Sequence, residues 1–180
     1  MELLKGRPAD ENGRCEVEIA TYDKLESLNI EFFRVDHSAA ETMEACEKID
    51  EVLGVKMCKN LFLCNRQKTQ FYLLMLPGDK PFITKEFSKQ LGVSRVSFSG
   101  GEFMQEFLKI APGSVSVMGL MNDKDNRVQL VVDKAIFDCE WVGCHPCINT
   151  SSLKIKTEDL KRFLIDVNHQ ATMVDLPYYE

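Results

Sequence analysis

The sequence predicts one α+β domain in which a mixed, mostly antiparallel sheet is flanked by helices. The chain has 180 residues, the usual length of a single domain and enough to bury a self-sufficient core. Its apolar fraction of 44% and charged fraction of 28% are typical of a globular protein. Strand-like and helix-like segments are interspersed without a regular strand–helix–strand repetition, which disfavours a purely parallel sheet.

The domain boundaries follow from composition at the two ends. Residues 1–15 are polar and rich in glycine and proline, so we expect a loose N-terminal leader. The domain itself is expected over residues 16–167. Residues 168–180, which end in LPYYE, are expected to form a C-terminal tail on the surface.

Apolar spacing and capping residues predict the elements of the first half. Thr42 can accept a hydrogen bond from a helical amide, and Gly54 can adopt the left-handed conformation that ends a helix. Two apolar runs joined by a polar link predict a β-hairpin. The expected elements are a helix over 16–29, a strand over 31–35, a helix over 43–53 and a hairpin of strands 60–64 and 69–76.

The same signals predict the second half. Thr84 and Thr157 are expected to cap helices, and the segment 111–125 is expected to be a loop because of its many turn residues. The expected elements are a helix over 84–91, a strand over 93–98, a helix over 101–110, strands over 128–132, 137–142 and 153–155, and a helix over 158–167.

Charge and hydropathy limit the partners. The chain carries 22 basic and 28 acidic side chains, a net charge of −6. Broad coating of a nucleic acid needs a basic face, so DNA is not an expected partner, although a few local lysines can still grip one end of an RNA. There is no apolar run of the roughly 20 residues that cross a bilayer, and no secretion signal at the N-terminus. We therefore expect a cytoplasmic protein with no membrane partner.

The cysteines and His145 raise the possibility of a dithiol redox site or a zinc site, and the spacing of these residues disfavours both. A redox site at the CxxC of Cys144 and Cys147 needs a helix after it, whereas the residues that follow look extended. A zinc site would need Cys58 and Cys64 together, about 20 Å apart on a straight strand. No metal and no cofactor are expected, although a thiol oxidoreductase stays open as a rival. The seven cysteines are expected to be free, mostly buried thiols.

Three features are candidates for function. Lys59 stands among apolar neighbours, where its ammonium must reach water or meet an anion such as phosphate. The loop Pro112–Leu120 contains glycines that let a ligand approach the backbone. His145 lies in a turn between extended segments, a frequent place for functional groups. Each also has a structural reading. His37 reads as a structural loop residue, and His169 as a solvated residue of the tail.

Five segments, in order, resemble the YbaK/prolyl-tRNA synthetase-associated editing domain family, in its free-standing ProX/PrdX-type branch. They are His37–Glu44, Lys59–Leu63, Leu76–Asp79, Pro112–Leu120 and Gly143–Pro146. The family's glycine loop often reads Ser-Pro-Phe-Gly, whereas residues 116–119 here read Ser-Val-Met-Gly. This departure bears on amino-acid selectivity more than on activity.

The resemblance implies a trans-editing deacylase that hydrolyses mischarged tRNA(Pro), above all Ala-tRNA(Pro). It implies that a positioned water attacks the aminoacyl ester with help from the substrate's 2′-hydroxyl. The implied catalytic residues are Lys59, Gly119 and His145, and the implied substrate-binding residues are Thr42, Asn60, Ser116 and Leu120. The implied partners are the tRNA acceptor end and prolyl-tRNA synthetase. The alternative is a non-catalytic module of the same fold that binds tRNA or a synthetase.

Overall fold

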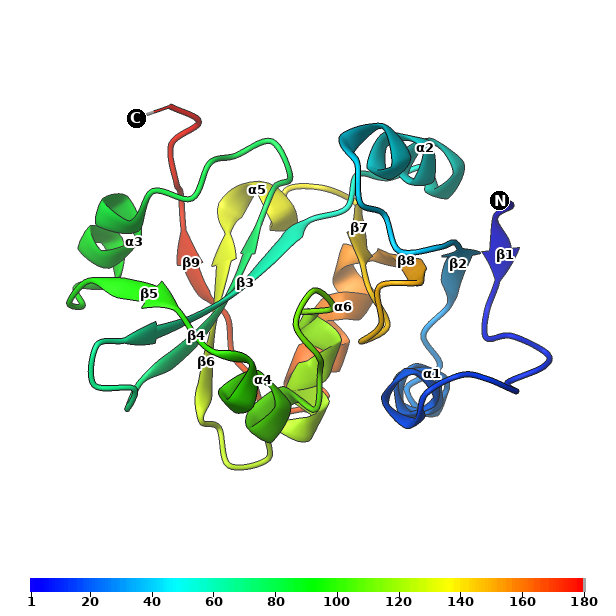
Figure 1. Cartoon of the computed structure of the whole chain (residues 1–180), viewed down its shortest axis with the longest axis horizontal. Coiled ribbons are helices and arrows are strands. Elements are labelled where there is room, and N and C mark those ends of the chain that lie inside the picture. The colour runs from blue at the N-terminus through cyan, green and yellow to red at the C-terminus, as the bar shows by residue number, and fades with distance from the viewer. Residues whose placement is uncertain (180) are drawn as a thin grey trace.

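The chain folds into two β-sheets with helices packed around them (Figure 1). The computed structural model describes residues 1–179. One sheet has four strands in the order β1–β2–β8–β7, and the other has five in the order β5–β3–β4–β6–β9. The predicted α+β class is confirmed, with the strands divided between two sheets. The strands are β1 (Leu4–Lys5), β2 (Phe32–Asp36), β3 (Lys59–Asn65), β4 (Phe71–Leu76), β5 (Val96–Phe98), β6 (Val128–Asp133), β7 (Trp141–Cys144), β8 (Ser151–Lys156) and β9 (Thr172–Val174).

The helices are short and pack against these sheets. They are α1 (Glu16–Ser27), α2 (Met43–Leu53), α3 (Thr84–Leu91), α4 (Gly101–Leu108), α5 (Lys134–Phe137) and α6 (Thr157–Asp166). The expected loop over 111–125 holds a 3₁₀ helix, η1 (Val117–Asn122). Among residues 1–179, no helix combines the length and the apolar composition that a membrane crossing requires.

The hairpin of β3 and β4 organises the five-stranded sheet. The two strands pair antiparallel from Lys59 opposite Leu76 to Cys64 opposite Phe71. β6 then joins β4 in parallel, and β9 joins β6 in parallel. Every residue of β4 is buried, as its continuous apolar sequence predicts for a strand covered on both faces.

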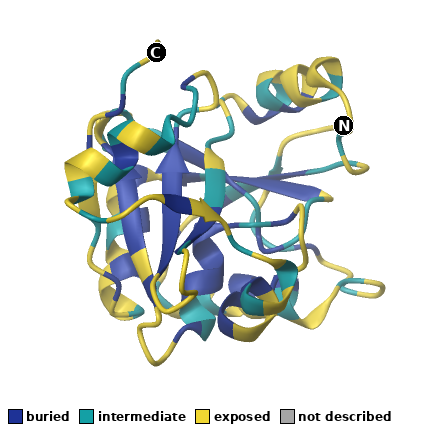
Figure 2. Ribbon diagram, turned by 60° about the vertical axis from the view of Figure 1, so that its left-hand side comes forward, coloured by how far each residue is buried: buried dark blue, intermediate teal, exposed yellow. Residues whose placement is uncertain are grey.

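The two faces of β4 supply two hydrophobic cores. Leu73 and Met75 belong to the main core, which lies between the sheets and receives side chains from α1, α4 and α6. Tyr72, Leu74 and Leu76 belong to the second core, which is covered by α3 and by residues 174–179, here called the C-terminal segment. Figure 2 shows the buried strands at the centre with exposed residues on the helices and loops around them. Alternation of side chains along the strand places neighbours in different cores.

Two of the four predicted helix signals are confirmed and two are wrong. Thr42 accepts a hydrogen bond from the amide of Ala45 at 3.1 Å, and Gly54 ends α2 with a φ of 76°. Thr84 and Thr157 are instead the first residues of their helices. The Thr157 hydroxyl turns away from the helix and donates to the carbonyl of Cys139.

The strand predicted over residues 137–142 is wrong in its first part. Asp133 accepts a hydrogen bond from the amide of Ala135 at 2.9 Å and begins the short helix α5. β7 therefore starts only at Trp141. The capping carboxylate outweighs the apolar pattern of the segment that follows it.

Both ends of the chain take part in the sheets. Residues 1–15, expected to be loose, contain β1, which pairs with β2, and Arg14 donates to Asp36 at 2.9 Å. Residues 168–180, expected to be a surface tail, contribute β9, and Leu176 is buried. His169 is also buried, against the prediction of a solvated residue, because its Nε2 lies 2.9 Å from the Asp123 carboxylate.

Candidate functional site

Three segments far apart in the sequence meet where β3 begins. The side-chain oxygen of Asn60 accepts a hydrogen bond from the amide of Val117 at 3.1 Å. The hydroxyl of Ser116 donates to the main-chain carbonyl of His145. These two bonds join the start of β3, the glycine-containing loop and the turn after β7. The structure thus brings together Asn60, Ser116 and His145 of the predicted site residues.

Lys59 points to the other side of the sheet from Asn60. Its ammonium donates to the main-chain carbonyl of Lys80 at 2.7 Å, and the residue is exposed. Strand alternation explains the difference: Leu61 packs against the second core, whereas Phe62 lies in the main core. In this structure, Asn60 rather than Lys59 contacts the glycine-containing loop.

The carbonyl that receives the Lys59 ammonium belongs to a firmly held residue. The Lys80 side chain is 3% exposed and lies 3.0 Å from Asp133 Oδ1, whose side chain is 0% exposed. Asp133 also accepts from the amide of Leu176 at 3.0 Å. This buried pair fixes the turn after β4 and the C-terminal segment to the same point.

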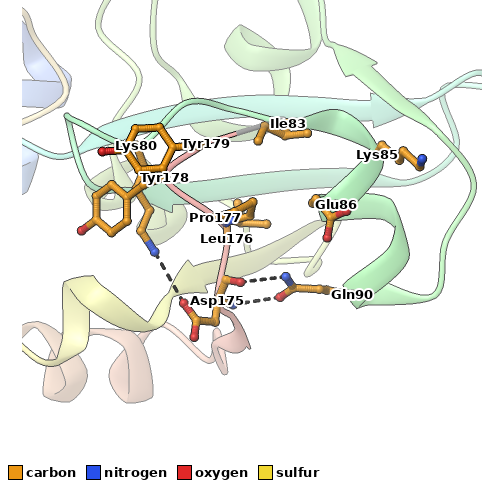
Figure 3. Close-up of a pocket in the computed structure, with 10 residues that line it drawn as sticks. All are labelled: Lys80, Ile83, Lys85, Glu86, Gln90, Asp175, Leu176, Pro177, Tyr178 and Tyr179. Carbon is orange, nitrogen blue, oxygen red and sulfur yellow. Dashed lines mark hydrogen bonds and ion pairs between the residues drawn. The ribbon is translucent and has the colours of Figure 1, made fainter.

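The C-terminal segment lies along α3 and borders a hollow of about 860 Å³ (Figure 3). In Figure 3, Asp175 reaches the Lys80 ammonium, at 3.5 Å, and exchanges two hydrogen bonds with Gln90, each 2.8 Å long. The hollow is lined by residues of α3 and of the C-terminal segment. None of the predicted site residues lines it.

His145 is set up as a neutral imidazole. Its Nδ1 lies 2.8 Å from the carbonyl of Ser151, so Nδ1 carries the proton and donates. Burial lowers the pKa of His145 below its ordinary value of 6.5, and the nearby His37 lowers it further, against the raising effect of the Ser151 bond. A neutral ring with this tautomer presents an unprotonated Nε2 as a hydrogen-bond acceptor.

His37, which the sequence predicts to be a structural loop residue, lies beside His145. Its ring centroid lies 6.5 Å from that of His145, and its Nε2 lies 2.8 Å from the hydroxyl of Ser152. With Thr42, it lines a hollow of about 350 Å³ at the start of α2. The sequence signal was its place at the head of the first family-like segment, five residues before Thr42.

Gly119 and Leu120 lie inside the protein and contribute to packing. The Gly119 amide donates to the carbonyl of Ser116 at 3.0 Å. A Cβ on Gly119 would stand 2.5 Å from Cδ1 of Ile110, so only glycine fits without a shift of its neighbours. Leu120 is 1% exposed and belongs to the main core.

The cysteines of the CxxC are buried and held as thiols. Burial raises the pKa of Cys147 to about 12 and raises that of Cys144 well above its ordinary value. A reactive redox cysteine needs the opposite shift, toward the thiolate. All seven cysteines are free; Cys64, Cys144 and Cys147 are buried, but Cys15, Cys46 and Cys139 are exposed. Among residues 1–179, no group of three or more His, Cys, Asp or Glu side chains is gathered for a metal ion.

Comparisons with known proteins identify the family to which the chain is similar. Residues 37–163 match the family model of the aminoacyl-tRNA editing domain. The prolyl-tRNA editing protein ProX of Acetoanaerobium sticklandii is 31% identical over 145 residues, which are 81% of this chain and 88% of that protein. The prolyl-tRNA synthetase associated domain-containing protein 1 of Danio rerio is 29% identical over 147 residues, 81% of this chain and 79% of that protein.

The fold is shared with a solved structure titled as a candidate trans-editing enzyme for prolyl-tRNA synthetase. The two superpose with a TM-score of 0.66 at 12% identity, over 91% of this chain and 99% of that one. The match to the family model spans His37, Lys59, the glycine-containing loop and His145. The chain belongs to the aminoacyl-tRNA editing domain family.

Proposed function

We propose that this protein is a trans-editing deacylase that hydrolyses mischarged tRNA(Pro), above all Ala-tRNA(Pro). The observation that carries the proposal is the junction of Asn60, Ser116 and His145. Lys59, the residue before Asn60, leaves the opposite face of β3 and holds its ammonium on the Lys80 carbonyl. Membership of the editing-domain family supports an action on tRNA. The name of the relative from Acetoanaerobium sticklandii supports prolyl-tRNA as the substrate.

The proposed chemistry is attack of water on the ester that joins the amino acid to the terminal ribose. This ester is already activated, so much of the barrier is overcome by holding a water and the carbonyl in line. The unprotonated Nε2 of His145 is suited to accept a hydrogen bond from that water or from the substrate's amino group. The neighbouring 2′-hydroxyl of the substrate is the proposed second partner of the water.

A serine nucleophile is not part of the proposal. Ser116 is 0% exposed, and its hydroxyl already donates to the carbonyl of His145 while it accepts from the amide of Met118. A hydroxyl committed in this way lacks the adjacent base that activates a nucleophilic serine. Its role in the proposal is to hold the loop against the His145 turn.

Lys59 is proposed to contact the phosphate of the terminal nucleotide. An exposed ammonium on a flexible stem binds phosphate as a point charge. Its present partner, the Lys80 carbonyl, is neutral, so the charge of Lys59 is available to an anion. Thr42, beside the hollow that it shares with His37, is proposed to limit the size of the amino acid.

A deacylase of this kind is needed because a synthetase cannot exclude smaller amino acids by binding alone. A pocket built for proline excludes a smaller side chain by only about 1–3 kcal/mol, so a second site that hydrolyses smaller products improves accuracy. Prolyl-tRNA synthetase, as the source of the mischarged tRNA, is the proposed functional partner. Gly119 and Leu120 are proposed to act indirectly, through packing that holds the loop in place.

The test is release of amino acid from purified Ala-tRNA(Pro) and Pro-tRNA(Pro). We expect rapid hydrolysis of the alanyl ester and at least tenfold slower hydrolysis of the prolyl ester. His145→Ala is expected to lower the rate constant for hydrolysis, measured at a temperature where circular dichroism shows the variant to be folded. Equal, uncatalysed loss of both esters would contradict the proposal.

The second candidate function is a non-catalytic module that binds tRNA or a synthetase. The position of Lys59 favours it, because its ammonium donates to the Lys80 carbonyl on the other side of β3 from the Asn60–Val117 bond. It predicts binding of tRNA without any release of amino acid from a panel of aminoacyl-tRNAs. The same hydrolysis assay therefore separates the two functions.

A further inference from the structure

The outer face of the four-stranded sheet carries aromatic rings between lysines. Phe33 and Lys154 are cross-strand neighbours on β2 and β8, and Trp141 pairs with Lys156 on β7 and β8. The alternate residues of these strands, such as Phe32, point into the main core. We call Phe33, Trp141, Lys154 and Lys156 the lysine–tryptophan face.

Contacts within this face place two lysine ammonium groups over the tryptophan ring. The ammonium of Lys154 lies 4.7 Å from the Trp141 ring centroid, and that of Lys156 lies 5.6 Å from it. Phe33 meets the same ring edge-on at 6.1 Å. Trp141 and Phe33 are only partly buried, so the face is open to a ligand.

A hollow of about 430 Å³ continues from this face toward β3. Its lining includes Trp141, Lys56 and Tyr178, and it also includes Cys58, which immediately precedes Lys59. The volume is in the range of pockets that hold small organic groups. The face and the hollow therefore form one surface that reaches Cys58, the residue before Lys59.

The lysines of this surface form no ion pairs with carboxylates of the protein. Among residues 1–179, Lys56, Lys154 and Lys156 form no ion pair within 4.0 Å, although the chain as a whole is acidic. The carboxylates near it are Asp79 and Glu140, which line the hollow, Glu31, which pairs with Lys5 at 3.3 Å, and Asp50, whose charge interacts with that of Lys56. Three unpaired lysines in a chain of net charge −6 are complementary to a polyanion.

We propose that this surface binds the single-stranded 3′ end of the RNA, upstream of the nucleotide at Lys59. A base stacks on the exposed part of Trp141 or enters the hollow, and Lys56, Lys154 and Lys156 contact phosphates. Aromatic platforms flanked by cations are the physical basis of sequence-tolerant single-strand binding. The proposal rests on the proposed function for the identity of the RNA, and it adds the surface that aligns the strand.

Trp141 provides a direct test because it is the only tryptophan in the chain. A short single-stranded RNA ending in CCA is titrated into the full-length protein, and tryptophan fluorescence is followed from 0.1 to 0.4 M salt. We expect saturable quenching that weakens as salt rises. Unchanged fluorescence, or quenching without saturation, overturns the proposal.

Paired substitutions separate the face from general charge. Lys154→Gln with Lys156→Gln removes two phosphate contacts, which lowers the salt slope by about 1.4 and weakens binding about 25-fold at 0.1 M salt. The matched control is Lys85→Gln with Lys89→Gln on the exposed side of α3, at the opposite end of the molecule (Figure 1), and it should bind RNA as the wild type does. Equal weakening by the two pairs overturns the proposal.

Two further measurements remove the remaining alternatives. If the first pair unfolds the sheet, Lys56→Gln, at an exposed position outside it, is expected to lower the salt slope by about 0.7. Polyglutamate that binds and quenches as well as RNA would assign the face to acidic proteins and overturn the proposal. RNA quenching with no hydrolysis of any aminoacyl-tRNA would refute the proposed function alone, whereas hydrolysis without quenching would refute only this surface.

Discussion

The ammonium of Lys59 donates to the main-chain carbonyl of Lys80 at 2.7 Å, and Lys80 is itself buried in an ion pair with Asp133. The main-chain carbonyl of Lys80 therefore orients the Lys59 side chain, while the ammonium of Lys80 pairs with Asp133. Asp133 extends the chain of contacts to the amide of Leu176 in the C-terminal segment. The position of the Lys59 ammonium, the candidate phosphate-binding group, therefore depends on the buried ion pair of Lys80 and Asp133.

Replacing Lys80 is expected to be costly. Lys80→Met leaves the Asp133 carboxylate buried without its cation, and breaking a buried pair in this way costs about 3–5 kcal/mol of unfolding free energy. Denaturant unfolding measures the loss. Lys80→Met with Asp133→Asn should recover part of it in a double-mutant cycle. Lys85→Met, on an exposed face of α3, is the control and should change stability by less than about 0.5 kcal/mol. Strict additivity of the two substitutions would show that the pair does not act as a unit.

Asn60 is expected to matter through its carbonyl oxygen. Asn60→Ala removes the acceptor for the Val117 amide and should cost about 1–3 kcal/mol, while it loosens the loop next to His145. Asn60→Asp keeps an acceptor at the same place and should retain most of the stability. Unfolding midpoints and deacylation rates of both variants check this. Equal damage by the two would mean that the amide's NH₂ group is the important one.

Gly119 is expected to tolerate no side chain. In Gly119→Ala the new Cβ would approach Ile110 Cδ1 to 2.5 Å and Leu108 Cβ to 3.1 Å. Overpacking of this kind costs about 1–3 kcal/mol. Ile110→Val removes the closest atom, so the double variant should be more stable than Gly119→Ala alone. A single Gly119→Ala variant with wild-type stability would contradict the packing role.

Acid is expected to destabilise the protein through Asp36. Burial tends to raise the pKa of Asp36, but hydrogen bonds from Arg14, Arg34 and Ser151 outweigh it and hold the pKa well below the ordinary 3.8. A lowered native pKa stabilises the fold above the unfolded value, and this stabilisation is lost as the pH falls below about 4. Unfolding free energies measured from pH 6 to pH 3 should fall, and Asp36→Asn should flatten the curve. An unchanged slope in that variant would assign the acid sensitivity to other carboxylates, such as Asp123.

Local signals predicted much of the fold. The hairpin of β3 and β4 and the helix between Thr42 and Gly54 follow from short segments with their own turn and capping residues. Thr84 and Thr157 carried the same signal, but each sits one residue later, inside its helix. A threonine next to a helix start does not tell these two positions apart without the backbone conformation.

Contacts distant in sequence were beyond prediction. The two sheets touch just before β3, where the Cys58 amide donates to the carbonyl of Gly143 in β7 at 3.1 Å, 85 residues later in the chain. His169 is buried because its Nε2 is hydrogen-bonded to the carboxylate of Asp123, 46 residues earlier. The choice of Asn60 over Lys59 as the partner of Val117 is likewise set by how the loop docks on the strand.

If Lys59 serves hydrolysis of the aminoacyl ester, its removal must slow the single-turnover release of alanine from Ala-tRNA(Pro). Wild-type protein, Lys59→Ala and the exposed control Lys89→Ala are compared at subsaturating substrate. We expect Lys59→Ala to release alanine at least tenfold more slowly with an unchanged unfolding midpoint, and Lys89→Ala to release alanine at the wild-type rate. Release by Lys59→Ala at the wild-type rate would contradict this role of Lys59.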